Sequence, residues 1–305
     1  MEQKKISVIM LTYNREALVS RAIESILAQT FGDFEYIIVD NGSSDRSCEI
    51  AEEYARKDSR IQVVHIPKSN IGTGRNTGLD LATGEYITFI DDDDMAEPNM
   101  LEFLYNLAME NGADISICGT NLKQFDEKFV LGTEEALIKL LERKYYNVGF
   151  PTKLIRRNLF QKNRFPAEGR YDDIYLMPRI IAAAKVVVYW GRPYYLVTRH
   201  ANNNSAWTTN HQLITPEILS EYLQVYRERT EWLEEQFQTH AHTWRYFEWS
   251  FMISMVDKIS KNNLTSCRKI SEVAKKELTY YYDEFYNSPH TQEFEREFMQ
   301  KYIIR

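Results

Sequence analysis

The chain has little of what several classes of protein require. Its three cysteines, Cys48, Cys118 and Cys267, are odd in number and too far apart for a disulfide framework or a metal–thiolate motif. No stretch approaches 18 uninterrupted apolar residues, so we expect no membrane-spanning helix. Lysine and arginine, 37 together, are outnumbered by 44 acidic residues, and the net charge of -7 argues against nucleic-acid binding. These absences predict a protein of a reducing compartment.

The N-terminus shows no targeting pattern. Polar residues 1–5 lead directly into a strand-like segment, so we expect no signal peptide. The predicted location is the cytoplasm, and peripheral contact with the inner face of the membrane stays open as an alternative.

Strand-like and helix-like segments alternate through the first 120 residues. The apolar, β-rich runs lie at 6–11, 36–39, 61–66, 86–90 and 114–118. Each intervening stretch is long enough for one helix, which predicts an α/β fold with a mainly parallel sheet covered on both faces. We expect Asn14 to cap the helix at 16–29, and residues 70–78 to form a glycine-rich loop that enters a short helix.

Past about residue 205 the composition shifts to long helical segments rich in Glu, Arg and aromatic residues. We therefore predict a domain at 1–205 and a helical region at 206–305, and divide the first into halves at 1–119 and 120–205. Aromatic stripes on the last helices predict core packing or contacts in a homo-oligomer.

Four consecutive carboxylates, Asp91 to Asp94, follow the buried strand at 86–90 without a linker. Ligands of open α/β sheets collect beyond the carboxyl ends of such strands. Repulsion among the four side chains calls for a cation, and their hard oxygen atoms suit Mg²⁺ or Mn²⁺. An acidic surface loop or a helix N-terminus would also explain the run.

Other polar residues stand at or near successive strand ends. They are Thr12, Tyr13, Asn14, Asp40, Arg75 and Asn76. An aromatic ring such as that of Tyr13 can stack on a base, and a carboxylate such as Asp40 can accept from a base N–H or a ribose hydroxyl. Packing or turn formation explains each residue better when it is taken singly. Their convergence at one sheet edge favours a nucleotide pocket.

These residues belong to motifs that resemble family 2 glycosyltransferases. The motifs are Ser7–Asn14, Ile38–Asp45, Asn70–Gly78, Gly84–Asp94 and Pro98, in the order and spacing of that family. The resemblance is dense over 6–119, sparser to about 205, and absent from the C-terminal helices. It implies the GT-A fold, which is Rossmann-like, with the C-terminal helices as an appendage.

The resemblance also implies roles for the acidic run. The family's Asp-x-Asp signature maps onto Asp91, facing the ribose, and Asp93, holding a divalent ion against the diphosphate. Asp92 stands where the family has a small or neutral residue, and we place it among the cofactor-binding residues. Asp94 stays open as the main metal ligand in place of Asp93.

Two later segments resemble further family motifs. Asp172 and Asp173 match an acidic pair at the head of a helix, which implies that Asp173 is the general base on the acceptor hydroxyl. A helix cap would be the plain alternative. Arg199 matches a position that neutralises donor phosphates, and His200 one that joins the metal, although a polar linker explains this segment equally well.

The implied enzyme is an inverting glycosyltransferase that takes a sugar from a nucleotide diphosphate, most often UDP. Its acceptor would be a hydroxyl of a glycan, lipid-linked or protein-linked, in surface glycan assembly. Two alternatives stay open: a nucleotidyltransferase, and a non-catalytic subunit that binds sugar nucleotides. The first would place a glycine-rich, basic loop straight after the first strand, where residues 12–14 stand instead.

Overall fold

The computed structural model describes residues 4–122, 125–169, 171–200, 208 and 210–303. The chain divides into two compact units, Met1–Thr198 and Arg199–Arg305. The sequence placed this division at residue 205, and the functions it assigned to the two domains stay predictions.

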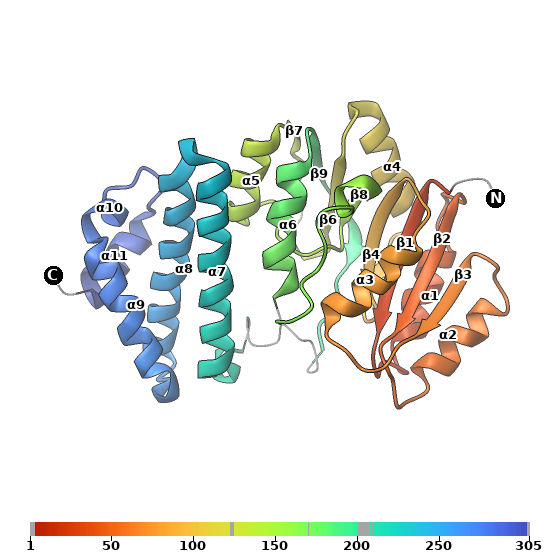
Figure 1. The fold of residues 1–305 in the computed structure, drawn as a ribbon, viewed down its shortest axis with the longest axis horizontal. Coiled ribbons are helices and arrows are strands. Elements are labelled where there is room, and N and C mark those ends of the chain that lie inside the picture. Colours follow the sequence, from red (N-terminus) through yellow and green to blue (C-terminus); the bar gives the residue numbers. More distant parts are fainter. Residues whose placement is uncertain (1–3, 123–124, 170, 201–207, 209, 304–305) are drawn as a thin grey trace. The chain divides into compact units, whose positions relative to one another are not determined.

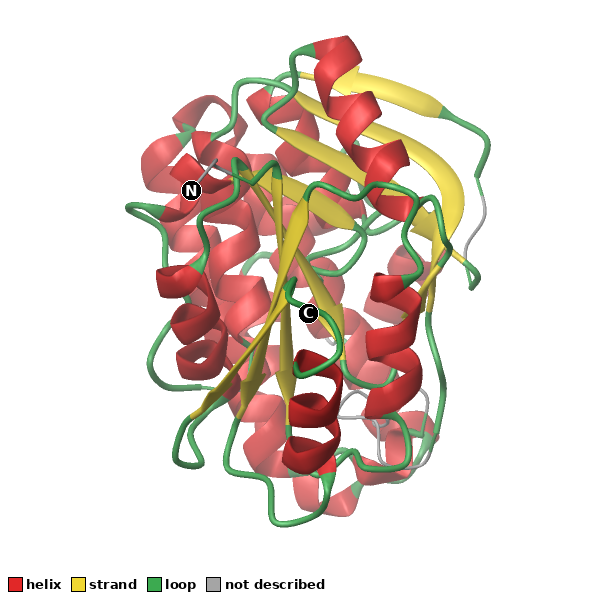
Figure 2. Ribbon diagram, turned by 90° about the vertical axis from the view of Figure 1, so that its right-hand side faces the viewer, coloured by secondary structure: helices red, strands yellow, loops and turns green. Residues whose placement is uncertain are grey.

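The first unit is built on one sheet, which has nine strands among the described residues. Its strands are β1 (Ile6–Thr12), β2 (Phe34–Asp40), β3 (Ile61–His65), β4 (Tyr86–Asp91), β5 (Met95–Ala96), β6 (Ile115–Thr120), β7 (Lys128–Leu131), β8 (Lys153–Arg156) and β9 (Val187–Leu196). They run in the order β3-β2-β1-β4-β8-β6-β9-β5, with β7 beside β9. Figure 1 labels these strands and Figure 2 shows their twist.

The sheet has a parallel half and a mixed half. Strands β1 to β4 are parallel to one another. Beyond them, β8 is antiparallel to both β4 and β6, while β6 and β9 are parallel. The predicted α/β class with a covered sheet is confirmed, but the expectation of a mainly parallel sheet holds only for the first half. Short strands β5, β7 and β8 lack the long apolar runs by which the sequence indicated β1 to β4 and β6.

Helices cover both faces of the sheet because successive strand residues point to opposite sides. The helices of this unit are α1 (Val19–Leu27), α2 (Ser47–Ala55), α3 (Ile71–Leu81), α4 (Met100–Asn111), α5 (Thr133–Glu142) and α6 (Asp172–Ala183). Val8 and Met10 join a core with residues of α1, α2 and α4. Ile9 and Leu11 face α3 on the other side.

The glycine-rich stretch is already helical, whereas the sequence predicted a loop there that enters a short helix. Helix α3 starts at Ile71, and the Asn70 side chain caps it by accepting from the Thr73 N–H at 2.8 Å. A Cβ on Gly74 would lie 2.3 Å from Leu11 Cδ1, and one on Gly78 2.5 Å from Ile9 Cγ2. These glycines therefore serve a close approach of helix to sheet, which outweighs their poor helix propensity.

The second unit is helical. Its helices are α7 (Pro216–Gln236), α8 (Ala241–Lys261), α9 (Arg268–Tyr280), α10 (Tyr282–Tyr286) and α11 (Glu293–Tyr302). Helices α7 and α8 lie side by side (Figure 1), and aromatic side chains such as Trp249 and Phe285 fill the core between the later helices. The stretch from 268 to 286 forms two helices, α9 and α10, which are separated at Tyr281. Within the described part of the chain, no helix combines the length and apolarity that crossing a membrane requires.

Candidate active site

The carboxyl ends of the parallel strands meet at one edge of the sheet. Thr12 pairs in register with Asp40, and Leu11 with Asp91. Thr12 and Asp40 are buried, whereas Asp91 is partly exposed. The structure thus brings together the polar residues that the sequence predicted at this edge, because parallel strands in near-equal register end at the same level.

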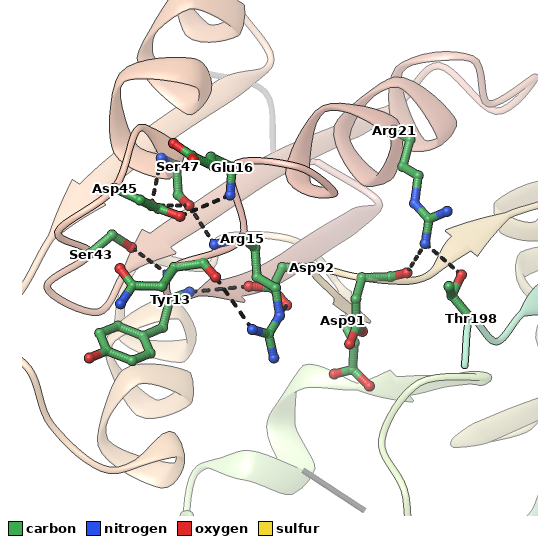
Figure 3. A network of polar contacts seen from close by, with 12 residues as sticks. Tyr13, Arg15, Glu16, Arg21, Ser43, Asp45, Ser47, Asp91, Asp92 and Thr198 are labelled. Atoms are coloured by element: carbon green, nitrogen blue, oxygen red, sulfur yellow. Dashed lines mark hydrogen bonds and ion pairs between the residues drawn. The ribbon is translucent and has the colours of Figure 1, made fainter. Parts of the chain in front are cut away.

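The loops after β1 and β2 are joined by polar contacts (Figure 3). The Asn14 N–H donates to Ser43 Oγ at 3.1 Å, and the Arg15 N–H to Ser47 Oγ at 2.6 Å. The Asn14 side-chain oxygen accepts from the Ser44 N–H at 2.8 Å. Asn14 has a left-handed backbone, with φ of 51°, and does not cap α1 as predicted. The Asn14 side-chain oxygen holds the loop after β2. The predicted role of Asn14 in donor binding stays a prediction.

Tyr13 has a partly exposed ring, as base stacking requires. The Lys68 ammonium lies over that ring, with Nζ 2.9 Å from the centroid. A cation on one face leaves the other as the candidate stacking surface. Lys68 was not among the predicted site residues, because its distance along the chain from Tyr13 hides this contact.

Within the acidic run, Asp92 and Asp94 accept hydrogen bonds from backbone N–H groups. Asp92 accepts from the Tyr13 N–H at 3.1 Å and faces Arg15 Nε at 3.5 Å. Asp94 accepts from the Thr198 N–H at 2.6 Å, where the chain leaves β9. Burial raises the pKa of Asp92 and of Asp94 to about 7 in each case. Asp94 is therefore engaged in anchoring the segment after β9.

Asp93 is buried beside these groups, and its backbone carbonyl accepts from the Arg21 guanidinium, which also donates to Thr198 Oγ1 at 2.7 Å (Figure 3). The negative charges of Asp91 and Asp93 add to burial in raising the pKa of Asp94. A cation would relieve this repulsion, and carboxylate oxygens are the ligands that Mg²⁺ and Mn²⁺ prefer. The residues present therefore fit a hard divalent ion.

Arg75 connects the acidic run with the second acidic pair. Its Nη2 lies 3.6 Å from Asp91 Oδ1, and its Nη1 donates to Asp172 Oδ2 at 3.1 Å. The guanidinium is enclosed by the rings of Phe89, Phe150 and Phe165, with centroids 5.4–5.9 Å from Cζ. One arginine thus brings Asp91 and the head of α6 into one site.

Asp172 and Asp173 open helix α6, where exposed backbone N–H groups favour negative charge. Asp172 is buried against Arg75, whereas Asp173 is partly exposed. Asp173 Oδ1 accepts from the Ile174 N–H at 2.8 Å. Partial burial and the charge of Asp172 raise the pKa of Asp173 to about 6, against the opposing effect of Arg75. Asp173 is therefore a carboxylate at neutral pH with more basicity than an ordinary aspartate.

The Asn76 side chain is hydrogen-bonded to the backbone of Phe165. Its side-chain amide donates to the Phe165 carbonyl at 2.9 Å and accepts from the Phe165 N–H at 3.1 Å. This pair of bonds fixes the loop that leads to Asp172. Its predicted part in donor binding stays a prediction.

Arg199 and His200 begin the second unit, where Arg199 is exposed and His200 partly buried. Their predicted contacts with the donor phosphates and the metal stay predictions. The following residues 201–207 lie outside the described part of the chain.

Comparison with known proteins gives the chain its family. Residues 7–169 match the family model "Glycosyl transferase family 2". The chain is 34% identical over 218 residues to the glycosyltransferase GlyG of Streptococcus pneumoniae, covering 65% of this chain and 72% of GlyG. It spans about a third of the length of some other curated relatives.

Two solved structures share the fold. S. aureus TarS 1–349 in complex with UDP-GlcNAc has a TM-score of 0.66 at 22% identity, over 81% of this chain and 71% of that one. The mannosyltransferase PcManGT of Pyrobaculum calidifontis, in complex with GDP-Man and Mn²⁺, has a TM-score of 0.59 at 13% identity, over 99% and 80%.

The chain belongs to glycosyltransferase family 2 and is a glycosyltransferase with the GT-A fold. The predicted family, fold and enzyme class are confirmed. Membership of this family sets aside the nucleotidyltransferase alternative.

Proposed function

We propose that this enzyme transfers a sugar from a UDP-sugar to a glycan hydroxyl, with inversion at the anomeric carbon. The observation that carries the proposal is Arg75, which joins Asp91 on the nucleotide side to Asp172 beside the candidate base. A donor site and a proton acceptor in one enclosed region are what a single displacement needs.

Asp173 is the proposed general base. The acceptor hydroxyl gives its proton to the Asp173 carboxylate while its oxygen forms a bond to the anomeric carbon. The bond from that carbon to the diphosphate oxygen breaks in the same step, and UDP leaves. A pKa of about 6 suits this role, because the carboxylate is ionised at neutral pH yet more basic than an unperturbed one.

The nucleotide side is assigned to the strand ends. Tyr13 offers a ring face to the base, Asp40 an acceptor to a base or ribose donor, and Asp91 an acceptor to the ribose. Asp93 would hold Mn²⁺ or Mg²⁺, which when bound neutralises charge on the leaving diphosphate. The ion is assigned to Asp93 because this residue matches the last position of the family's Asp-x-Asp signature.

The choice of UDP is supported by TarS, whose structure contains UDP-GlcNAc, and that of Mn²⁺ by PcManGT. The acceptor is proposed to be a lipid-linked or protein-linked glycan in surface glycan assembly. A location of the enzyme in the cytoplasm, at the inner face of the membrane, would fit such an acceptor.

The test is a screen of nucleotide sugars with the purified protein and Mn²⁺. We expect one UDP-sugar to be hydrolysed slowly to UDP, without pyrophosphate. Asp93→Asn should remove the effect of Mn²⁺ on UDP affinity, and Asp80→Asn, an exposed carboxylate on α3, should not. No turnover and no binding of any nucleotide sugar would overturn the proposal, whereas binding without turnover would favour the non-catalytic subunit that binds sugar nucleotides.

A further inference from the structure

A second group of metal-binding side chains lies where β2, β3 and α2 meet. Asp40 ends β2, His65 ends β3 in register with it, and Cys48 stands in the first turn of α2. One ligand atom from each lies within 4.8 Å of the other two. The donor set combines oxygen, nitrogen and sulfur, unlike the all-oxygen set of the acidic run.

The two separations from His65 are those of a tetrahedral zinc site. His65 Nδ1 lies 3.3 Å from Cys48 Sγ and 3.5 Å from Asp40 Oδ2. Zinc bonds of about 2.0 Å to nitrogen or oxygen and about 2.3 Å to sulfur place tetrahedral ligand atoms roughly 3.3–3.6 Å apart. Both distances from His65 lie in that range, and Cys48 Sγ and an Asp40 oxygen lie within 4.8 Å of each other, so an ion would need only limited movement of these side chains.

The other ring nitrogen of His65 is already oriented. Nε2 lies 2.8 Å from Glu52 Oε1, one helical turn beyond Cys48 on α2. Histidine ligands commonly donate their second N–H to a carboxylate, which fixes the tautomer that leaves the first nitrogen free to bind metal. Glu52 would hold His65 with Nδ1 directed at Cys48 and Asp40.

We propose that Asp40, Cys48 and His65 form a binding site for Zn²⁺ or a similar borderline-soft divalent ion, with Glu52 orienting His65. Three protein ligands leave a fourth position for water. Sulfur and imidazole favour zinc over Mn²⁺ or Mg²⁺, so this site and Asp93 select different ions.

The site has a consequence that rests on the proposed function. Asp40 is also the carboxylate assigned to the nucleoside. While it binds zinc, it cannot accept a hydrogen bond from the base or the ribose. Zinc should therefore weaken the binding of UDP, while Mn²⁺ strengthens it.

Cobalt reports on this site directly, because thiolate-bound Co²⁺ absorbs in the near ultraviolet. Adding Co²⁺ to the reduced full-length protein should produce this thiolate band, and an equivalent of Zn²⁺ should abolish it. Cys48→Ser and His65→Ala should lose the band, although Cys118 and Cys267 remain. Asp93→Asn should keep it. Circular dichroism shows whether each variant is folded.

The alternative is a protonated His65 held between Glu52 and Asp40 with no metal. In that case no thiolate band appears, or the band survives Cys48→Ser, and either result overturns the site. If the band forms and UDP binds without changing it, the antagonism is wrong and the metal site stands. If UDP does not bind even without cobalt, the proposed function fails instead.

Discussion

The two halves of the sheet in the first unit position their carboxylates in different ways. In the parallel half, Asp40 and Asp91 stand at one edge because β2 and β4 pair in register with β1. In the mixed half, Asp172 and Asp173 come from helix α6, beyond the short strand β8. Backbone hydrogen bonds of the sheet fix the positions of Asp40 and Asp91, whereas contacts between side chains fix the positions of Asp172 and Asp173.

The main side chain that fixes the position of this acidic pair is Arg75, which belongs to the parallel half. Its ion pair with Asp172 and the bonds of Asn76 to Phe165 tie the loop before α6 to helix α3. The nucleotide edge should therefore tolerate local changes. The position of the general base, Asp173, should depend on a few buried contacts. Four predictions test this difference.

Asp173→Asn should have the largest effect. Losing a general base costs about 10²–10⁴-fold in rate, and Asn is close to Asp in shape. Sugar transfer should fall by that factor, while UDP affinity in Mn²⁺ stays within about twofold. Single-turnover transfer and UDP titration measure the two. A variant that loses UDP binding would show that Asp173 belongs to the nucleotide side.

Arg75→Met should destabilise the first unit by about 3–5 kcal/mol, because Asp172 would be left buried without its cation. Urea unfolding measures the loss. Combining it with Asp172→Asn should restore part of the stability, since the unpaired charge is then gone. Strictly additive losses in this double-mutant cycle would mean that the pair does not couple the two halves.

The pH dependence of transfer should follow Asp173. Its pKa lies above the ordinary aspartate value, at about 6. Protonated Asp173 cannot accept a proton, so the rate should fall about tenfold per pH unit below pH 6 and be level above it. Asp92→Asn removes another carboxyl of raised pKa and should leave this limb in place. If the fall in rate below pH 6 disappears in Asp92→Asn, this pH dependence arises from Asp92 at the nucleotide edge and not from Asp173.

Asp92→Asn itself should have the smallest effect. The amide oxygen still accepts from the Tyr13 N–H, and only the charge facing Arg15 is lost. We expect only a small loss in the free energy of unfolding, measured by urea titration, because burial raises the pKa of Asp92 to about 7 and leaves the carboxyl only partly charged at neutral pH. A change of UDP affinity above about tenfold would place Asp92 in contact with the donor.

The sequence predicted the parallel half well and the mixed half poorly. Long apolar runs ending in polar residues indicated β1, β2 and β4 and the edge they share. The glycines of α3 suggested a loop before a short helix, because their contact with Ile9 and Leu11 cannot be seen from the sequence. Short β8, with four residues, has too little pattern to be distinguished from a loop.

Local pattern therefore determined the family, the fold class and the residues at each strand end. The tertiary structure decided what each carboxylate does. Asp92 and Asp94 hold backbone N–H groups, Asp172 holds Arg75, and Asp40 faces His65. Partners such as Arg75 and Asp172 are 97 positions apart. Spacing along a chain records periodicity but not such distant pairings, which exist only once the sheet and its helices have packed.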